Sequence, residues 1–304
     1  MNILLVTNMY PSEGDVSWRG SFVKEQVDMS QAHNKDINYE ILHIKGRVCG
    51  GSNLNYLLAP LLVLKKMLLN KFDAIHCHHA FCVLVSSLFF NKIIYTVHEG
   101  ELNNHKTSIL IKLAILLSNK VIFVNHAEFL KSKHKRKFFL PCGIDFSFFK
   151  SSDVAPNGCI LFPADPNRVE KNASLLREAE AVITANYPNV KFIYGGKIPR
   201  EEMPYLMRQS LLVVTIGKFE SDGLVLKEAM ASNVPVVSTD VGNASYYLNE
   251  QSGLICLANA ESLTSSILKI LGGRNSYLGG RERLSSLHVD QEKTVSKLAK
   301  IYQS

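Results

Sequence analysis

The sequence lacks the features that mark several protein classes. Its six cysteines are scattered, with no C-x-x-C pair and no spacing to histidines that would suit a metal site. It has no run of eighteen or more uncharged apolar residues, which argues against a membrane-spanning helix. Met1 is followed directly by strand-like NILLVT instead of a signal peptide. We therefore expect reduced thiols and a cytoplasmic location.

Nucleic-acid recognition also finds little support. Tryptophan occurs once, and no recognisable RNA- or DNA-binding module is present. The formal net charge of +7 lies wholly in the first half: residues 1–152 hold 18 basic and 11 acidic side chains, whereas residues 153–304 hold 16 of each. A basic half predicts an anionic partner, and we favour a membrane surface or an acidic acceptor over nucleic acid.

The most informative stretch runs from Val213 to Val241. Two β-branched runs, Leu211 to Ile216 and Val234 to Thr239, enclose good helix formers from Leu226 to Ala231. This order predicts a βαβ unit. The first loop and the helix N-terminus of such a unit point into one crevice, where backbone N–H groups and the helix dipole favour an anion.

Two carboxylates belong to this unit. Glu220 lies at the tip of the loop from Gly217 to Gly223, and Glu228 follows eight residues later inside the helix. Both can accept hydrogen bonds from a polyol that lies across the helix start. A nucleotide sugar combines such hydroxyls with a diphosphate. The competing interpretation is a pair of solvated acids in an ordinary βαβ unit.

The pattern Glu220-x7-Glu228, followed by AMASNVPVVSTDVGN, resembles the donor-site motif of retaining glycosyltransferases with the GT-B fold, particularly family 4. The resemblance implies that Glu228 holds the ribose hydroxyls and that Glu220 lies at the transferred sugar. It also implies that the backbone after Glu220 cradles sugar and phosphate, and a glycine gives that turn its flexibility. The donor-binding segment is then Ser221, Asp222, Gly223, Leu224 and Val225.

A second loop supplies candidate cations. PADPNRVEKN follows the expected strand Cys159 to Phe162 and precedes an expected helix at 173–185. Arg168 and Lys171 lie in this loop, where a diphosphate needs countercharge. The resemblance implies that both residues clamp the donor diphosphate. The alternative is two solvated loop cations.

The first half alternates strand-like and helical stretches, as doubly wound α/β domains do. Its strands are expected at 2–7, 39–44, 74–77, 93–97 and 121–124. His98 follows one of them at its carboxyl end, where α/β proteins bind ligands. Its T-x-H setting resembles that of a family histidine that approaches the transferred sugar, which implies a catalytic role. Glu99 and Glu101 are near enough to compete for this role.

The first loop and a histidine cluster complete this half. The stretch NMYP…GSFVKEQV resembles the family loop over the reaction site, with Gly20 as the matching residue and Arg19 as a candidate phosphate partner or a solvated cation. His76 and His78 share one side of a strand, but no acidic or cysteine partner accompanies them at ligand spacing. We expect no metal there and a structural role for His76.

Two expected helices, Leu54 to Leu69 and Ser108 to Leu117, are unusually apolar. We expect the first to face the core, with its lysines extending to solvent. The second is followed by the basic run Lys131 to Lys137 and favours contact with an anionic membrane, since each basic residue near such lipid contributes about 1 kcal/mol. We therefore expect peripheral attachment to the inner face of the plasma membrane.

The expected fold is α/β of the GT-B type, with two Rossmann-like domains whose parallel sheets face each other across a cleft. The domains are residues 1–152 for the acceptor and 153–285 for the nucleotide sugar, and residues 286–304 form a helix that crosses back to the first domain. Gly143 and Asp145 match the hinge of the family, and a turn needs those residue types.

The resemblance implies retaining transfer of a hexose or N-acetylhexosamine from a nucleotide sugar, with UDP favoured. The acceptor would be a saccharide or a lipid-linked sugar in surface polysaccharide, lipopolysaccharide or glycolipid biosynthesis. No D-x-D occurs, and the other major glycosyltransferase architecture uses that motif to hold diphosphate through a metal, so we expect no cofactor and no metal. Two alternatives remain: a sugar-nucleotide epimerase or phosphorylase, and a non-catalytic subunit that binds nucleotide sugar.

Overall fold

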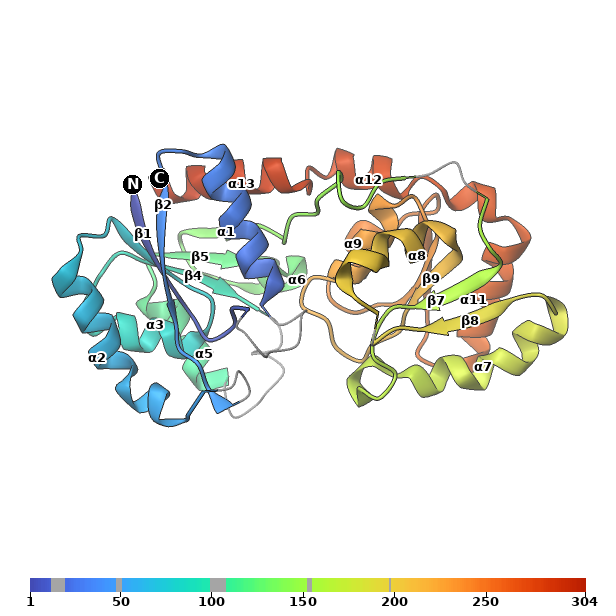
Figure 1. Ribbon diagram of the computed structural model, residues 1–304, viewed down its shortest axis with the longest axis horizontal. Coiled ribbons are helices and arrows are strands. Elements are labelled where there is room, and N and C mark those ends of the chain that lie inside the picture. The colour runs from blue at the N-terminus through green and yellow to red at the C-terminus, as the bar shows by residue number, and fades with distance from the viewer. Residues whose placement is uncertain (12–19, 48–50, 99–107, 152–154, 197) are drawn as a thin grey trace. The chain divides into compact units, whose positions relative to one another are not determined.

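The computed structural model describes residues 1–11, 20–47, 51–98, 108–151, 155–196 and 198–304. The chain forms two compact units (Figure 1). The first contains Met1–Gly143 and Gln291–Ser304, and the second contains Ile144–Asp290. The boundaries expected from the sequence lay after residues 152 and 285. Each unit has its own parallel sheet, covered on both faces by helices.

The first sheet has six parallel strands in the order β2-β1-β3-β4-β5-β6. Their bounds are β1 Asn2–Thr7, β2 Asn38–His43, β3 Ala74–Cys77, β4 Ile93–Val97, β5 Lys120–Phe123 and β6 Lys137–Phe139. Runs such as NILLVT and IIYTV are almost entirely buried, as in a parallel strand covered on both faces. The first five strands were predicted within one residue. The sixth was missed, because it begins inside the basic run.

Helices cover both faces of this sheet (Figure 1). On one face α2 (Leu54–Leu69), α3 (Ala80–Ser86) and α5 (Ser108–Leu117) share a core with β1, β3 and β4. On the other face lie α1 (Ser21–His33) and α13 (Gln291–Gln303). A short α6 (His126–Lys131) follows β5.

The last helix is anchored to the first sheet at its C-terminus. Nζ of Lys120 donates to the carbonyls of Ile301 and Tyr302 at 2.6 and 3.2 Å. Arg136 donates at 2.5 Å to the carbonyl of Ser304. Both cations satisfy carbonyls that a helix end leaves unpaired, and they complement its dipole. The return of the last helix to the first unit, expected from the GT-B resemblance, is present.

The second sheet has five parallel strands in the order β11-β10-β9-β7-β8. Their bounds are β7 Cys159–Phe162, β8 Lys191–Tyr194, β9 Ser210–Thr215, β10 Val236–Thr239 and β11 Gly253–Cys256. The chain moves outward from β7 to β8 and then returns to place β9 on the other side of β7. Strands β7 and β9 therefore flank the topological switch point, where open α/β sheets bind ligands beyond the carboxyl ends of the strands.

Two helical layers enclose the second sheet. Helices α8 (Met203–Gln209), α9 (Leu224–Ala231) and α12 (Gly280–Ser286) share one core, and α7 (Ala173–Asn186) and α11 (Ala260–Gly272) share the opposite one. The short α10 (Ala244–Tyr247) follows β10. Helix α9 begins at Leu224, two residues earlier than predicted, because Gly223 supplies the turn that starts it.

Helix α2 differs from its expected packing. Only Ala59 and Val63 are fully buried, and a row of leucines lies on the surface. The exposed large apolar side chains of α2 and α5 are Leu54, Leu57, Leu58, Leu61, Leu68, Leu69, Ile109, Leu110, Leu113, Leu116 and Leu117. One side of α2 therefore faces the core as predicted, whereas the exposed leucines of its other side were not predicted. Within the described ranges, no helix is both long and apolar enough to cross a membrane.

Candidate functional site

Three loops join at the carboxyl edge of the second sheet. The backbone N–H of Lys218, after β9, donates at 2.8 Å to the carbonyl of Glu170, after β7. Thr239, at the end of β10, donates its hydroxyl at 3.0 Å to the carbonyl of Gly217. A Cβ on Gly217 would lie 3.3 Å from the Glu170 carbonyl, so a larger residue would crowd this junction. The loops after β7, β9 and β10 thus form one continuous surface beside the switch point.

A cation and a carboxylate form an ion pair on this surface. Nζ of Lys171 donates to Oε1 of Glu220, and the two side chains are 16% and 29% exposed. Gly242, with a φ of 62°, brings the loop after β10 close to Glu220, and a Cβ at Gly242 would lie 3.0 Å from the Glu220 Cβ. The structure therefore brings together two predicted site residues from different loops, both within reach of a ligand.

A second ion pair lies at the same edge. Nη1 of Arg200, in the loop after β8, donates at 2.9 Å to Oε1 of Glu228 on α9. The Glu228 side chain is only 4% exposed, and a buried carboxylate needs such a countercharge. The guanidinium of Arg200 also lies over the rings of Phe148 and Phe149, 5.9 and 5.7 Å from their centroids. Arg200 is thereby held in place on both sides.

Arg168 makes a local contact. Its Nε donates at 2.7 Å to Oε1 of Glu170 within the same loop. The Glu170 backbone N–H and the Arg168 guanidinium together hold the pKa of Glu170 below its usual value. Arg168 is thus oriented by an acid two residues away, in the loop that also carries Lys171.

The start of α9 has the geometry of an anion site. Gly223 caps the helix with a φ of 87°, a conformation that favours glycine. Leu224 and Val225 are the first two residues of the eight-residue helix, whose initial N–H groups have no partner within the helix. Ser221 precedes this turn. The predicted cradle is therefore a glycine turn that leads into a helix N-terminus.

Asp222 turns into the protein. Its carboxylate accepts from Nζ of Lys227 at 2.5 Å, from Nδ2 of Asn243 at 2.7 Å and from the hydroxyl of Tyr247. Asp222 and Lys227 are 3% and 0% exposed, and the Lys227 ammonium lies 5.2 Å from the centroid of the Tyr247 ring. This buried network fixes the loop between Glu220 and Gly223. Asp222 can therefore contact a nucleotide sugar through its backbone and not through its side chain.

The first unit places His98 at the carboxyl end of β4. Its Nε2 lies 3.4 Å from Nδ1 of His78, in a hydrogen bond. The ring of Phe22, on α1, packs edge-on against His98 at 5.2 Å between centroids. Gly20, the residue before α1, has a φ of 69°, and a Cβ there would lie 2.6 Å from the backbone nitrogen of Tyr10. The predicted residues Arg19, Glu99 and Glu101 lie outside the described residues.

His76 joins three elements of the first unit. Its Nδ1 lies 2.7 Å from the hydroxyl of Tyr302 on α13, and its Nε2 lies 2.7 Å from the hydroxyl of Thr96 on β4. Burial, with a smaller contribution from His98, lowers the pKa of His76 to about 3. His76 therefore links strands to the last helix as an uncharged imidazole. Among the described residues, no three His, Cys, Asp or Glu side chains gather as a metal-ligand set.

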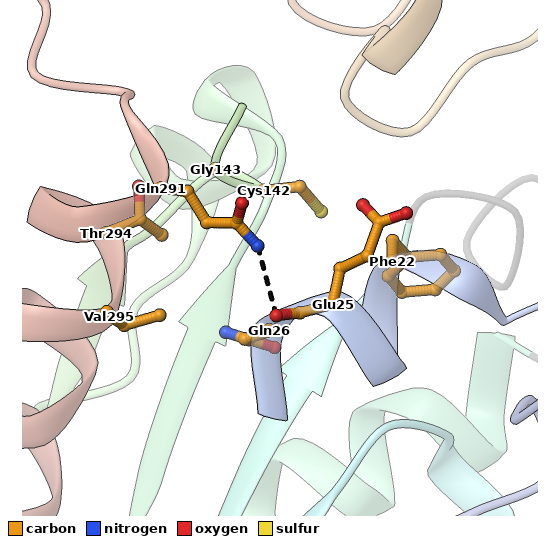
Figure 2. Close-up of a pocket in the computed structure, with 8 residues that line it drawn as sticks. All are labelled: Phe22, Glu25, Gln26, Cys142, Gly143, Gln291, Thr294 and Val295. Atoms are coloured by element: carbon orange, nitrogen blue, oxygen red, sulfur yellow. Dashed lines mark hydrogen bonds between the residues drawn. The ribbon is translucent and has the colours of Figure 1, made fainter. Parts of the chain in front are cut away.

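A small cavity lies between α1 and α13 in the first unit (Figure 2). Its walls come from α1, from α13 and from the chain just before Ile144. Gln291 crosses one side of it and donates at 3.0 Å to the carbonyl of Glu25. Phe22 both lines the cavity and packs on His98. The full lining is Phe22, Glu25, Gln26, Cys142, Gly143, Gln291, Thr294 and Val295.

Sequence reasoning missed several residues of the second edge. Arg200 lies far along the chain from its acidic partner Glu228, and Lys227 lies inside a helix. The sequence offers no spacing rule that pairs either cation with its carboxylate. Gly242 could have been noticed as a glycine in the loop after an expected strand. Asn243 and Tyr247 carry no sequence signal of their own, because their role depends on the burial of Asp222.

Comparison with known proteins bears on both the fold and the second unit. The family model described as glycosyl transferases group 1 matches residues 171–284. A phosphatidylinositol N-acetylglucosaminyltransferase subunit from Arabidopsis thaliana is 23% identical over 66% of this chain and 55% of its own length. An uncharacterized glycosyltransferase of Methanocaldococcus jannaschii is 24% identical over 76% of this chain and 75% of its own. This chain thus spans only about half of the first relative.

Solved structures match the whole chain. Sucrose-phosphate synthase from Thermosynechococcus elongatus has a TM-score of 0.78 at 17% identity and covers 99% of this chain and 98% of its own. HepE from Anabaena, in complex with UDP-glucose, has a TM-score of 0.73 at 15% identity and covers 100% and 99%. These likenesses confirm the predicted fold. The protein is a GT-B protein, and its second unit carries a domain of the group 1 glycosyl transferases.

Proposed function

We propose that the protein is a glycosyltransferase that takes a sugar from a nucleotide sugar held by the second unit. The observation that carries this proposal is the pair of ion pairs, Lys171 with Glu220 and Arg200 with Glu228, beside the N-terminus of α9. Each carboxylate already faces a cation, so hydroxyls and phosphates of a donor can share these partners. The family of residues 171–284 supports the same activity.

The proposed roles follow from charge and position. Glu228 accepts the ribose hydroxyls, and Glu220 lies at the transferred sugar. Lys171, with Arg168, meets the diphosphate, together with the first N–H groups of α9. These groups would stabilise the departing nucleoside diphosphate electrostatically, which is usually the largest contribution in such catalysis. We therefore propose transfer without a metal, with retention at the anomeric carbon, and a hexose or N-acetylhexosamine as the sugar.

UDP is the proposed nucleotide. Its support is the similarity to HepE, whose structure contains UDP-glucose. A panel of UDP, GDP and ADP with their common sugar conjugates, in the presence of EDTA, tests the base and the metal together by thermal shift. We expect one nucleotide family to stabilise the wild type and to stabilise Glu228→Ala much less. The control is Glu178→Ala, an exposed acid on α7. A shift of the same size in Glu228→Ala, or no shift in the wild type, contradicts this donor site.

Product analysis separates a transferase from its alternatives. A transferase releases nucleoside diphosphate and lengthens an added acceptor, whereas an epimerase changes the donor sugar without any acceptor, and a phosphorylase needs inorganic phosphate. Donor binding without turnover under every condition would identify a non-catalytic binding subunit.

We propose that the acceptor is a lipid-linked sugar of a surface polysaccharide or glycolipid pathway, met at an anionic membrane. The support is the apolar surface of α2 and α5, where Leu57, Leu68 and Leu116 are 76, 78 and 78% exposed. Soluble monomers rarely expose so many neighbouring large apolar residues. Lys65 and Lys112 lie exposed among them, on the half of the chain that carries all the net charge.

The basic run contributes less to this surface than its sequence implied. Lys137 donates at 2.7 Å to the carbonyls of Phe129 and Ser132, and Arg136 caps α13. Flotation with vesicles of anionic lipid therefore tests the leucines directly. We expect the double variant Leu57→Ser with Leu116→Ser to bind far less than the wild type, and Leu257→Ser, with a 70% exposed leucine in the second unit, to bind unchanged. Equal binding of all three proteins would contradict the proposal that α2 and α5 bind the membrane.

A further inference from the structure

His78 is a buried histidine beside the candidate catalytic His98. It directly follows β3, and its side chain is 1% exposed. Its Nδ1 lies 3.4 Å from Nε2 of His98, and the two rings are stacked at 23° with centroids 5.6 Å apart. The ring of His76 packs on it at 4.4 Å. His78 thus lies between the structural imidazole of His76 and the imidazole that is predicted to approach the transferred sugar.

His78 is uncharged at neutral pH. Burial, followed by the nearby imidazoles of His76 and His98, lowers the pKa of His78 well below its ordinary value of 6.5. A neutral imidazole carries one proton, either on Nδ1 or on Nε2, and the other nitrogen can only accept. The surroundings of the two nitrogens decide between these tautomers.

The two nitrogens of His78 have unequal surroundings. Nδ1 faces His98, whereas Nε2 is buried and has no hydrogen-bond partner among the described residues. A proton on Nε2 would leave a buried N–H donor unpaired, and such donors are the rarest unsatisfied groups in folded proteins. A proton on Nδ1 instead places the N–H in the hydrogen bond with His98. The tautomer of His78 with its proton on Nδ1 is therefore favoured.

The tautomer of His78 determines the tautomer of His98. When Nδ1 of His78 donates, Nε2 of His98 must accept, so a neutral His98 carries its proton on Nδ1. A protonated His98 would instead have to donate from Nε2, and it would force the proton of His78 onto the unpaired Nε2. His78 therefore opposes both the other neutral tautomer and the imidazolium form of His98.

We propose that His78 is a positioning residue that holds His98 as the neutral tautomer with its proton on Nδ1. The inference rests on the proposed function and on the predicted contact of His98 with the transferred sugar. In that contact, Nδ1–H of His98 donates a hydrogen bond to a sugar hydroxyl. An uncharged donor suits this place, because positive charge develops at the anomeric carbon during glycosyl transfer and a cation beside it would be unfavourable.

The wild-type protein without substrate gives the first test. Protein labelled with ¹⁵N-histidine is studied by NMR correlation of the ring nitrogens with the carbon-bound ring protons, which distinguishes a protonated from a bare nitrogen. We expect both His78 and His98 to carry the proton on Nδ1 and to have a bare Nε2. A proton on Nε2 of His98 overturns the proposal. This measurement needs no turnover, so it stands even if the proposed function is wrong.

Variants then test the consequence for catalysis. His78→Phe keeps the ring volume and removes the donor, and we expect His98 to lose its Nδ1–H preference and kcat to fall about tenfold with the donor KM unchanged. His78→Gln keeps an N–H donor at the same place and should restore both the Nδ1–H preference of His98 and kcat. The control is His79→Asn, which preserves the side-chain cap on the N–H of Phe81 and should change neither.

The outcomes separate positioning from mere packing. A loss of activity in His78→Phe with an unchanged His98 tautomer overturns the proposal, because the residue would then act only through packing. The proposal also fails if His78→Gln folds but does not restore the tautomer. If the wild type turns over no nucleotide sugar while the NMR result is as expected, the proposed function fails and the tautomer assignment stands.

Discussion

Among the residues that the structure describes, the carboxyl edges of the two parallel sheets differ in chemistry. In the second unit, the edge carries ion pairs: Lys171 with Glu220, Arg200 with Glu228, and the buried Lys227 with Asp222. In the first unit, the described part of the edge holds imidazoles and hydroxyls, and burial keeps His76 and His78 uncharged at neutral pH. Nine of the ten histidines of the chain belong to the first unit.

This difference shows that the sheet supplies only the location, whereas the loop residues supply the chemistry. Paired charges suit a ligand with phosphates, because the ligand can replace one partner without leaving the other charge alone. Neutral imidazoles suit a ligand that offers hydroxyls, since each can donate one hydrogen bond and accept another. The predictions that follow disturb the charged edge first and the uncharged edge last.

The largest effect should come from the buried pair beneath the charged edge. Asp222→Leu removes the carboxylate that faces Lys227 and leaves its ammonium, at 0% exposure, without that countercharge, so we expect the second unit to lose about 3–5 kcal/mol of unfolding free energy. Urea denaturation measures it. The double variant Asp222→Leu with Lys227→Leu should regain much of the loss, since no buried charge remains. A double variant no more stable than the single one would contradict this account.

Lys171 should matter most for turnover. Lys171→Ala removes the cation that faces Glu220, and with it the proposed charge for the departing diphosphate. We expect kcat to fall about 10²–10³-fold, as when one preorganised donor is removed from a charge-stabilising site. Steady-state kinetics measure this, and Glu220→Ala should also act mainly on turnover. The matched control is Lys191→Ala, an exposed lysine at the start of β8, whose kinetics should stay unchanged.

Glu228 should act on donor binding instead. Glu228→Ala removes an acceptor for the ribose hydroxyls, and we expect the donor Kd to rise about 10–100-fold, since hydrogen bonds to charged groups contribute about 1.5–3 kcal/mol. Titration calorimetry measures the affinity. Arg200→Ala should weaken binding as well, because it leaves the buried carboxylate without its countercharge. Unchanged donor affinity in both variants would separate this ion pair from the donor site.

The sequence predicts part of the charged edge, because the spacing of Glu220 and Glu228 belongs to one βαβ unit. Glu220, Gly223 and Glu228 lie within one short loop and the helix that follows it, so a βαβ unit keeps all three near the same edge of the sheet. Arg200 lies 28 residues from its partner, so only the packing of β8 beside β7 brings them together. No local pattern in the sequence contains that information.

The apolar helices illustrate the opposite case. The sequence predicted α2 with both of its ends correct, yet it did not predict which side faces the sheet. Leucines surround the helix, so periodicity could not distinguish the core-facing from the exposed stripe. The small residue Ala59 and the β-branched Val63 make the close contact with the core, and the larger leucines remain outside.

The last and smallest effect should appear in the uncharged edge on mild acidification. Burial lowers the pKa of His76 from 6.5 to about 3 and that of His79 to about 4, so the folded first unit holds both imidazoles neutral. The unfolded chain binds these protons once the pH falls below 6.5. Their contribution to stability is therefore complete above that pH and is lost as the pH falls towards 3.

We expect each buried imidazole to cost the first unit up to about 1.4 kcal/mol per pH unit below 6.5. In the second unit the resolved carboxyl shift is at Glu170, whose lowered pKa matters only below 4.5. Hydrogen exchange by mass spectrometry, at about pH 7 and about pH 5.5 with correction for intrinsic rates, reports both units in one sample. Protection should fall in β3 and β4 and persist in β7 and β9. Equal losses in both sheets would mean that the buried histidines do not set the acid sensitivity, and the contrast between the two edges would then be confined to ligand chemistry.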